Sequence, residues 1–64
     1  ALRDIVHAAP ERLLPGAWLL LEHGYDQGPA VRALLSQRGF SQAQTRPDLA
    51  GIPRCTGAVW RPAN

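Results

Sequence analysis

The residues best suited to chemistry lie in one short segment, residues 22–28, which follows an apolar run and precedes a helical pattern. The segment holds a carboxylate at Glu22, an imidazole at His23 and an amide at Gln27. Ligands of open α/β sheets bind at the carboxyl ends of the strands, where this segment is expected to lie. Each polar residue also has a purely structural interpretation, because Glu22 would simply end a strand in solvent and Asp26 would cap the next helix. The segment is therefore a candidate edge of a binding cleft, with no catalytic residue assigned.

Three other kinds of site are disfavoured by spacing. A metal site needs three or four converging ligands, whereas His7, His23 and Cys55 fall on different predicted elements. Cys55 is in the middle of a predicted strand, where a thiol usually packs as a small hydrophobe instead of acting as a nucleophile. Gly24 and Gly28 are not followed by the basic and hydroxyl residues of a phosphate-binding loop. We expect no metal ion.

The composition favours a cytoplasmic protein that does not bind nucleic acid. The net charge of +2 comes from seven arginines spread along the chain, whereas a nucleic-acid surface needs several cations converging on one groove. The single cysteine cannot form an internal disulfide, and the chain has no signal peptide or long apolar span. The lack of lysine, together with abundant Ala, Leu, Gly and Pro, suggests a GC-rich bacterial gene.

The beginning of the chain resembles the interior of a longer protein. A chain of this size buries only about 60% of its unfolded surface, and no disulfide or metal site compensates here. There is no methionine, and a helical pattern starts at Leu2 without a capping residue before it. We therefore expect residues 1–64 to be a single incomplete domain.

The first half of the chain predicts a helix and a strand. Apolar residues recur at helical spacing over residues 2–14, and Pro10 either kinks this helix or begins a second short one. Residues 17–22 are an unbroken apolar run between Pro-Gly and His-Gly. This run predicts a strand buried on both faces, as in the centre of a parallel sheet, with a buried helical turn as the alternative.

The second half predicts a helix and two strands. The helix is capped by Asp26, carries Pro29 in its first turn and ends at Gly39. Residues 41–46 form a weakly apolar strand suited to a sheet edge, and residues 54–60 form the last strand, antiparallel to it. If both helical crossovers run in the same direction, the right-handed rule places both helices on one face of the sheet. The strand at 17–22 would then have one face uncovered.

A family resemblance covers almost the whole chain. The residues that carry it are the run Leu-Pro-Gly-Ala-Trp-Leu-Leu-Leu-Glu-His-Gly at 14–24, Gln27-Gly28, Ala30-Val31, Gly39-Phe40, and Asp48-Leu49-Ala50-Gly51 with Arg54. Together they resemble the C-terminal part of the bacterial release factor glutamine methyltransferases. The Leu-Glu-His-Gly and Asp-Leu-Ala-Gly-x-x-Arg segments, at their mutual spacing, are the most specific part of the match.

The resemblance implies a fragment of an enzyme that uses S-adenosyl-L-methionine (AdoMet) to methylate the side-chain amide of a glutamine in peptide chain release factors. It also implies an α/β fold with a seven-stranded sheet. This chain would supply its last three strands in the order helix, strand, helix, strand, strand, with the last strand antiparallel and between the other two. The glycine-rich cofactor loop and the Asn-Pro-Pro-Tyr motif of the family would lie before Ala1. No catalytic or cofactor-binding residue is therefore assigned, and the chain alone is expected to be inactive.

At most, Glu22, His23 and Gln27 would border the substrate side of the cleft. The sequence departs from the family at Pro29, where a glutamate is usual, and at Pro53, where a polar residue is common. Two other readings stay open: a fragment of a nucleic-acid adenine methyltransferase, which the scattered charge disfavours, and a free-standing interaction module, which the uncapped start disfavours. The uncovered strand face also predicts that the isolated chain associates with itself.

Overall fold

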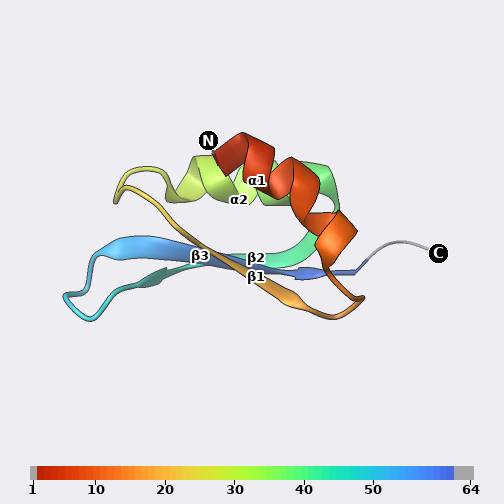
Figure 1. Ribbon diagram of the computed structural model, residues 1–64. Helices are drawn as coiled ribbons and strands as arrows, with labels where there is room; N and C mark the ends of the chain where they lie inside the picture. The colour runs from red at the N-terminus through yellow and green to blue at the C-terminus, as the bar shows by residue number, and fades with distance from the viewer. Residues whose placement is uncertain (1, 62–64) are drawn as a thin grey trace.

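The computed structural model describes residues 2–61 and has the predicted order of helix, strand, helix, strand, strand, with a short 3-10 helix added after the first helix (Figure 1). The elements are α1 (Leu2–Ala8), a short 3-10 helix η1 (Ala9–Arg12), β1 (Trp18–Glu22), α2 (Gly28–Arg38), β2 (Phe40–Pro47) and β3 (Pro53–Trp60).

The three strands form one sheet in the order β1-β3-β2, so the last strand lies in the middle. β3 is antiparallel to both neighbours, and β1 and β2 therefore run parallel to each other without pairing directly. This arrangement confirms the predicted position and direction of the last strand. It also means that the crossover through α2 skips one strand position, which β3 fills.

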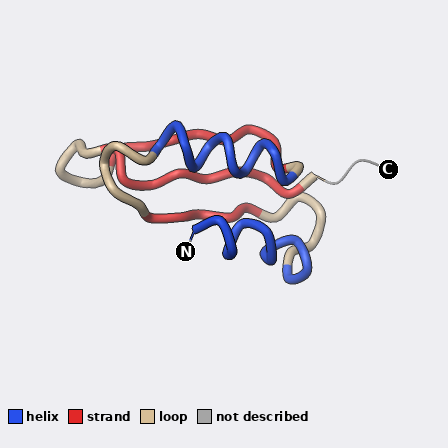
Figure 2. Tube along the Cα trace, turned by 90° about the horizontal axis from the view of Figure 1, so that it is seen from above, coloured by secondary structure: helices blue, strands red, loops and turns tan. Residues whose placement is uncertain are grey.

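Both helices lie on the same face of the sheet, as the handedness rule predicted (Figure 1). Seen from above, α2 runs over β2 and β3, and α1 lies on the β1 side (Figure 2). The core between the helices and the sheet is made of buried apolar side chains contributed by every helix and strand except η1. They are Val6, Leu21, Val31, Leu35, Phe40 and Ala58.

Local backbone chemistry explains where both helices end. α1 stops at Ala8, and Pro10 occupies the first turn of η1, so of the two predicted alternatives the structure shows two short helices and not a kinked one. α2 ends at Gly39, whose φ of 107° is in the left-handed region and whose N–H donates to the carbonyls of Leu35 and Ser36. Phe40 then turns back into the core beside Leu35, as predicted.

The predicted cap of α2 by Asp26 is wrong. The residue that precedes the helix is Gln27, and no side-chain hydrogen bond caps the helix. Asp26 instead lies within a tight turn in which the Gln27 N–H donates to the Gly24 carbonyl at 3.0 Å. Pro29, in the first turn of the helix, has no N–H and so removes one of the donors that a cap would satisfy.

The prediction that β1 is buried on both faces is also wrong for this chain. Leu21 faces the helices and is 7% exposed, whereas Trp18 and Leu20 on the opposite face are 52% and 67% exposed. β1 is at the edge of the sheet, and nothing in the described residues covers that second face. The expectation of one uncovered face is thus confirmed.

β2 contains a β-bulge that the sequence did not predict. Its register with β3 shifts between Ser41 and Gln44, and Gln42 within the shift has a positive φ of 59°. The extra residue lets Ala43 pack against the core, although strict alternation from Phe40 would place it on the other face.

Candidate functional site

The carboxyl end of β1 opens into a hollow of about 300 Å³. Two segments distant in sequence line it, with Glu22 and His23 on one side and Asp48, Arg54 and Cys55 on the other. Sheet pairing brings them together, because Glu22 is opposite Cys55 and the His23 N–H donates to the Arg54 carbonyl at 2.9 Å. The hollow lies at the strand end where the sequence placed the candidate cleft.

The lining mixes charges of both signs. Glu22 and Arg54 are exposed, and Cys55 is partly buried. The carboxylate of Asp48 is held by its own loop, because its Oδ1 accepts from the N–H of Ala50 at 2.8 Å and from that of Ile52 at 2.9 Å. Asp48 therefore presents a fixed carboxylate at the rim, while Glu22 is the acid on the β1 side.

Both ring nitrogens of His23 are engaged. Nδ1 is 2.8 Å from the carbonyl oxygen of Gly24, and Nε2 is 2.6 Å from the hydroxyl of Thr56. Thr56 is completely buried, and its hydroxyl also contacts that of Thr45 at 2.8 Å. An Arg32 Nη1 donates to Thr45 in turn. The imidazole is thus the partly exposed end of a series of hydrogen-bonded side chains that runs beneath the helices.

Gln27 does not line the hollow. Its side-chain oxygen accepts from the Gly24 N–H at 2.7 Å, and its own N–H donates back to the Gly24 carbonyl. These two reciprocal bonds close the turn between β1 and α2. Of the three residues predicted to border a cleft, Glu22 and His23 therefore line the hollow, and Gln27 shapes the turn that leads away from it.

The sequence analysis did not identify Thr45, Thr56 or Arg32 as functional residues. Thr56 could have been found, because it is a hydroxyl residue between Cys55 and Gly57 on the inward face of an otherwise apolar strand. A buried hydroxyl needs a partner, and within the described residues no buried side-chain polar atom lacks one.

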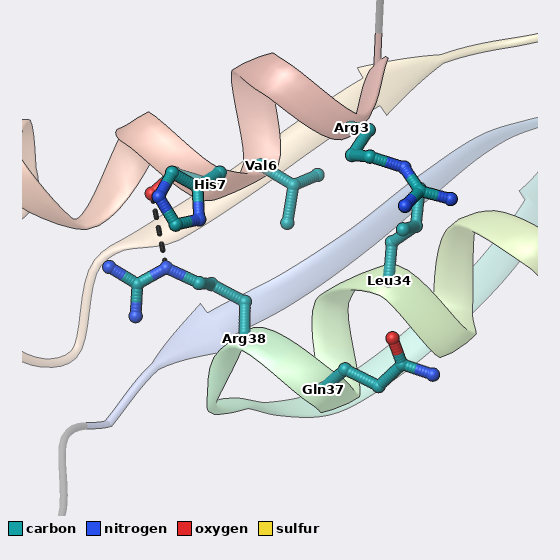
Figure 3. Close-up of a pocket in the computed structure, with 6 residues that line it drawn as sticks. All are labelled: Arg3, Val6, His7, Leu34, Gln37 and Arg38. Atoms are coloured by element: carbon teal, nitrogen blue, oxygen red, sulfur yellow. Dashed lines mark hydrogen bonds between the residues drawn. The ribbon is translucent and has the colours of Figure 1, made fainter.

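A second hollow, of about 250 Å³, lies between the two helices (Figure 3). It is lined by Arg3, Val6, His7, Leu34, Gln37 and Arg38. Arg38 makes two contacts within the protein. Its Nε donates to the His7 carbonyl at 3.0 Å, and its guanidinium lies 5.8 Å from the centre of the Trp60 ring. This arginine ties α1 to α2 and to the end of β3.

Neither a metal-binding cluster nor a membrane-spanning helix is found in the described part of the chain. Among residues 2–61, no group of three or more His, Cys, Asp or Glu side chains is placed to hold a metal ion. No helix in that range is long and apolar enough to cross a membrane.

Comparison with known proteins gives a consistent result. The chain is 53% identical over 55 residues to the release factor glutamine methyltransferase of Neisseria gonorrhoeae, which is 86% of this chain and 20% of that protein. It is 56% identical over 59 residues to the Pseudomonas aeruginosa enzyme of the same name, which is 92% of this chain and 21% of that protein. The Bordetella pertussis enzyme is 53% identical over 57 residues, or 89% of this chain and 21% of the enzyme.

The chain thus spans about a fifth of the length of the curated relatives it matches. No protein-family model matches it, and no solved structure gives a significant match. The relatives confirm the resemblance that residues 14–54 carry.

Proposed function

We propose that this chain is part of a bacterial enzyme that transfers a methyl group from AdoMet to a glutamine side chain of peptide chain release factors. The observation that carries the proposal is identity of 53 to 56% across most of the chain to proteins named release factor glutamine methyltransferase. Within this chain, the Glu22-His23-Gly24 segment lies at the end of a strand, where α/β sheets bind their ligands. A protein that acts on release factors would work in the cytoplasm.

Residues 1–64 would then belong to a larger catalytic domain with a seven-stranded sheet. The free edge of β1 and the exposed side chains of Trp18 and Leu20 support this, because an unpaired strand edge beside apolar surface invites further structure. The chain also covers only about a fifth of its relatives. In the isolated chain the same surface would promote self-association, which sedimentation at increasing concentration would reveal.

AdoMet would be held by residues outside this chain. A cofactor cradle needs glycines whose missing side chain lets the backbone approach the ligand. Here a Cβ at Gly28 would meet Thr45 and Arg32 at 3.0 and 3.2 Å, and a Cβ at Gly57 would meet Leu20 at 2.6 Å. These two buried glycines face the protein's own side chains, so neither leaves room for a cofactor against its backbone. When bound elsewhere, AdoMet supplies the methyl group.

The contribution of this chain would be to form one border of the substrate cleft. Glu22 and His23 line the hollow at the end of β1, and Gln27 closes the turn behind them. We assign this border to the substrate side and assign no catalytic residue within the chain. The reading as an adenine methyltransferase is not favoured, since the matched relatives are named for release factors.

A methyl-transfer assay with the full-length protein tests the proposal. The protein, AdoMet and a bacterial release factor should give a release factor carrying one added methyl group on a glutamine, identified by mass spectrometry. A release factor in which that glutamine is replaced by asparagine is the control. The isolated chain should neither transfer methyl nor show specific amide shifts with AdoMet, because orientation of the reactants, worth roughly 7 to 11 kcal/mol, would be lost.

Two outcomes would contradict the proposal. Methylation of adenine in DNA, with the release factor unchanged, would support the nucleic-acid reading. Saturable AdoMet shifts in the isolated chain, clustered at residues 22–28, would indicate a complete small cofactor-binding module.

A further inference from the structure

A continuous chain of hydrogen bonds crosses the molecule beneath the helices, from α2 through β2 and β3 to the end of β1. It runs from Arg32 to Thr45, to Thr56 at 2.8 Å, to His23 Nε2 at 2.6 Å, and from His23 Nδ1 to the Gly24 carbonyl at 2.8 Å. Thr56, in its centre, is completely buried, so water cannot replace these partners.

The direction of the chain follows from its two ends. The Gly24 carbonyl carries no hydrogen, so His23 Nδ1 must be the donor there. In the neutral ring the other nitrogen is then an acceptor, and the Thr56 hydroxyl must donate to Nε2. Because that hydroxyl has only one hydrogen, Thr45 must be the donor in the bond between the two threonines.

The other end agrees with this order. A guanidinium only donates, so Thr45 accepts from Arg32 and keeps its own hydrogen for Thr56. Every hydroxyl thus accepts one bond and donates one. The opposite neutral tautomer, with the hydrogen on Nε2, would leave the Nδ1 lone pair facing the Gly24 carbonyl oxygen at 2.8 Å, which is repulsive.

We infer that Thr56 is a positioning residue that holds neutral His23 in the Nδ1–H tautomer. Because both of its ring nitrogens are hydrogen-bonded, His23 has a structural role and does not act as a base or a metal ligand. Its Nδ1–H and the Gln27 N–H donate to the same Gly24 carbonyl, so the His23 ring fixes the turn that leaves the end of β1. The statement that this turn borders a substrate cleft rests on the proposed function. The assignment of the tautomer does not depend on that function.

Nitrogen NMR of the histidine ring tests the inference directly. The full-length protein, labelled with ¹⁵N-histidine, is studied at about pH 8.5, well above the ordinary imidazole pKa of about 6.5. The two-bond proton–nitrogen correlations of His23 are assigned as the signals that disappear in His23→Phe. They should show Nδ1 protonated and Nε2 unprotonated. The Nδ1–H tautomer should exceed the Nε2–H tautomer by at least about fivefold, because only the Nδ1–H form donates a hydrogen bond to the Gly24 carbonyl.

Variants of the threonine test the link. Thr56→Val keeps the shape but removes the hydroxyl, and it should shift the Nε2 resonance towards that of a nitrogen without a hydrogen bond. Thr56→Ser should retain the original resonance, as should Ser36→Ala, which removes an exposed hydroxyl elsewhere on α2.

A protonated Nε2 in the unmodified protein, or two tautomers in comparable amounts, would overturn the inference. An Nε2 resonance unchanged by Thr56→Val would overturn the role of Thr56. If Thr56→Val does not fold, Thr56→Ala takes its place, because it also removes the hydroxyl, and the tautomer of the unmodified protein is decided independently. These readouts do not require methyl transfer, so a failure of the proposed function would be seen separately.

Discussion

The two faces of the sheet differ in what covers them, and the same strands contribute to both. On the helix-covered face, Leu21 of β1 and Ala58 of β3 are buried beneath α1 and α2. On the open face, Leu20 is 67% exposed although it is as apolar as its neighbour. Side-chain chemistry therefore does not determine burial here. On the open face the edge strand β1 exposes Leu20, whereas Val59 of the central strand, opposite Trp18, is 1% exposed.

The covered face also contains the buried polar groups. Thr56, which is opposite both Leu21 and Thr45, has its hydroxyl satisfied on the helix side of the sheet. The open face presents instead Trp18 and Leu20 to the outside. Substitutions on the two faces should thus differ in cost, and the difference can be measured with matched pairs.

The largest difference is expected between two leucines. Leu35→Ala, at a fully buried position, should lower the free energy of unfolding by about 2 to 5 kcal/mol, because it leaves a cavity. Leu20→Ala should cost less than about 1 kcal/mol, since most of that side chain is already in solvent. Urea denaturation of the 64-residue chain measures both, and equal costs would mean that the open face is covered, for example by self-association.

A buried hydroxyl is expected to come next. Thr56→Val should cost about 1 to 3 kcal/mol, because Thr45 loses its acceptor and His23 loses its donor inside the protein. Ser36→Ala, an exposed hydroxyl on α2, should stay within about 0.5 kcal/mol of the unmodified chain. Thermal denaturation of both variants checks this, and similar midpoints would show that the hydrogen-bond chain contributes nothing to stability.

Two glycines should behave differently although both are buried. Gly28→Ala should cost about 1 to 3 kcal/mol, because the new Cβ would lie 3.0 Å from the Thr45 hydroxyl, which is held by its hydrogen bonds. Gly57→Ala should be close to neutral. Its Cβ would clash with the tip of Leu20 alone, at 2.6 Å, since its other neighbours lie at ordinary contact distances of 3.5 and 3.8 Å. The exposed Leu20 side chain can turn away, and alanine suits a strand better than glycine. Chemical denaturation would decide, and the opposite ranking would contradict the two-face comparison.

The smallest effect is expected at the edge of the covered face. Arg38→Gln should cost about 1 kcal/mol, because it removes the bond to the His7 carbonyl and the contact with the Trp60 ring. Arg12→Gln, an exposed arginine of η1, serves as the control and should change stability by no more than about 0.5 kcal/mol. Equal stability of the two variants would show that Arg38 does not tie the helices together.

Features that depend on nearest neighbours in the chain were predictable. Pro10 ended α1 and Gly39 ended α2 because a missing N–H and a missing side chain act locally on the backbone. The position of the last strand followed from the family resemblance, and it was confirmed by the pairing of β3 with both neighbours. Glu22 and His23 were placed at the end of a strand because the apolar run before them is visible in the sequence, and both line the hollow there.

Features that depend on distant segments were not predictable. The cap of α2 is a local exception: Asp26 has the chemistry of a cap, but the competing reciprocal bonds between Gly24 and Gln27 set the turn. The bulge at Gln42 appears only when β2 is aligned with β3. Asp48 and Arg54 were part of the resemblance, yet their place beside Glu22 required the antiparallel pairing of β1 with β3.

The sequence by itself determined the order of the elements, the places where the helices end and the family that the chain resembles, because each depends on local backbone preferences or on short segments at fixed spacing. Only the tertiary structure decided which face of β1 is buried and which partners His23 has. Burial of Leu21 requires the helices that cover its face of the sheet, and the hydrogen bond to Thr56 joins residues 33 positions apart. Neither is encoded at any one place in the chain, since both arise when β3 is inserted between β1 and β2 beneath the helices.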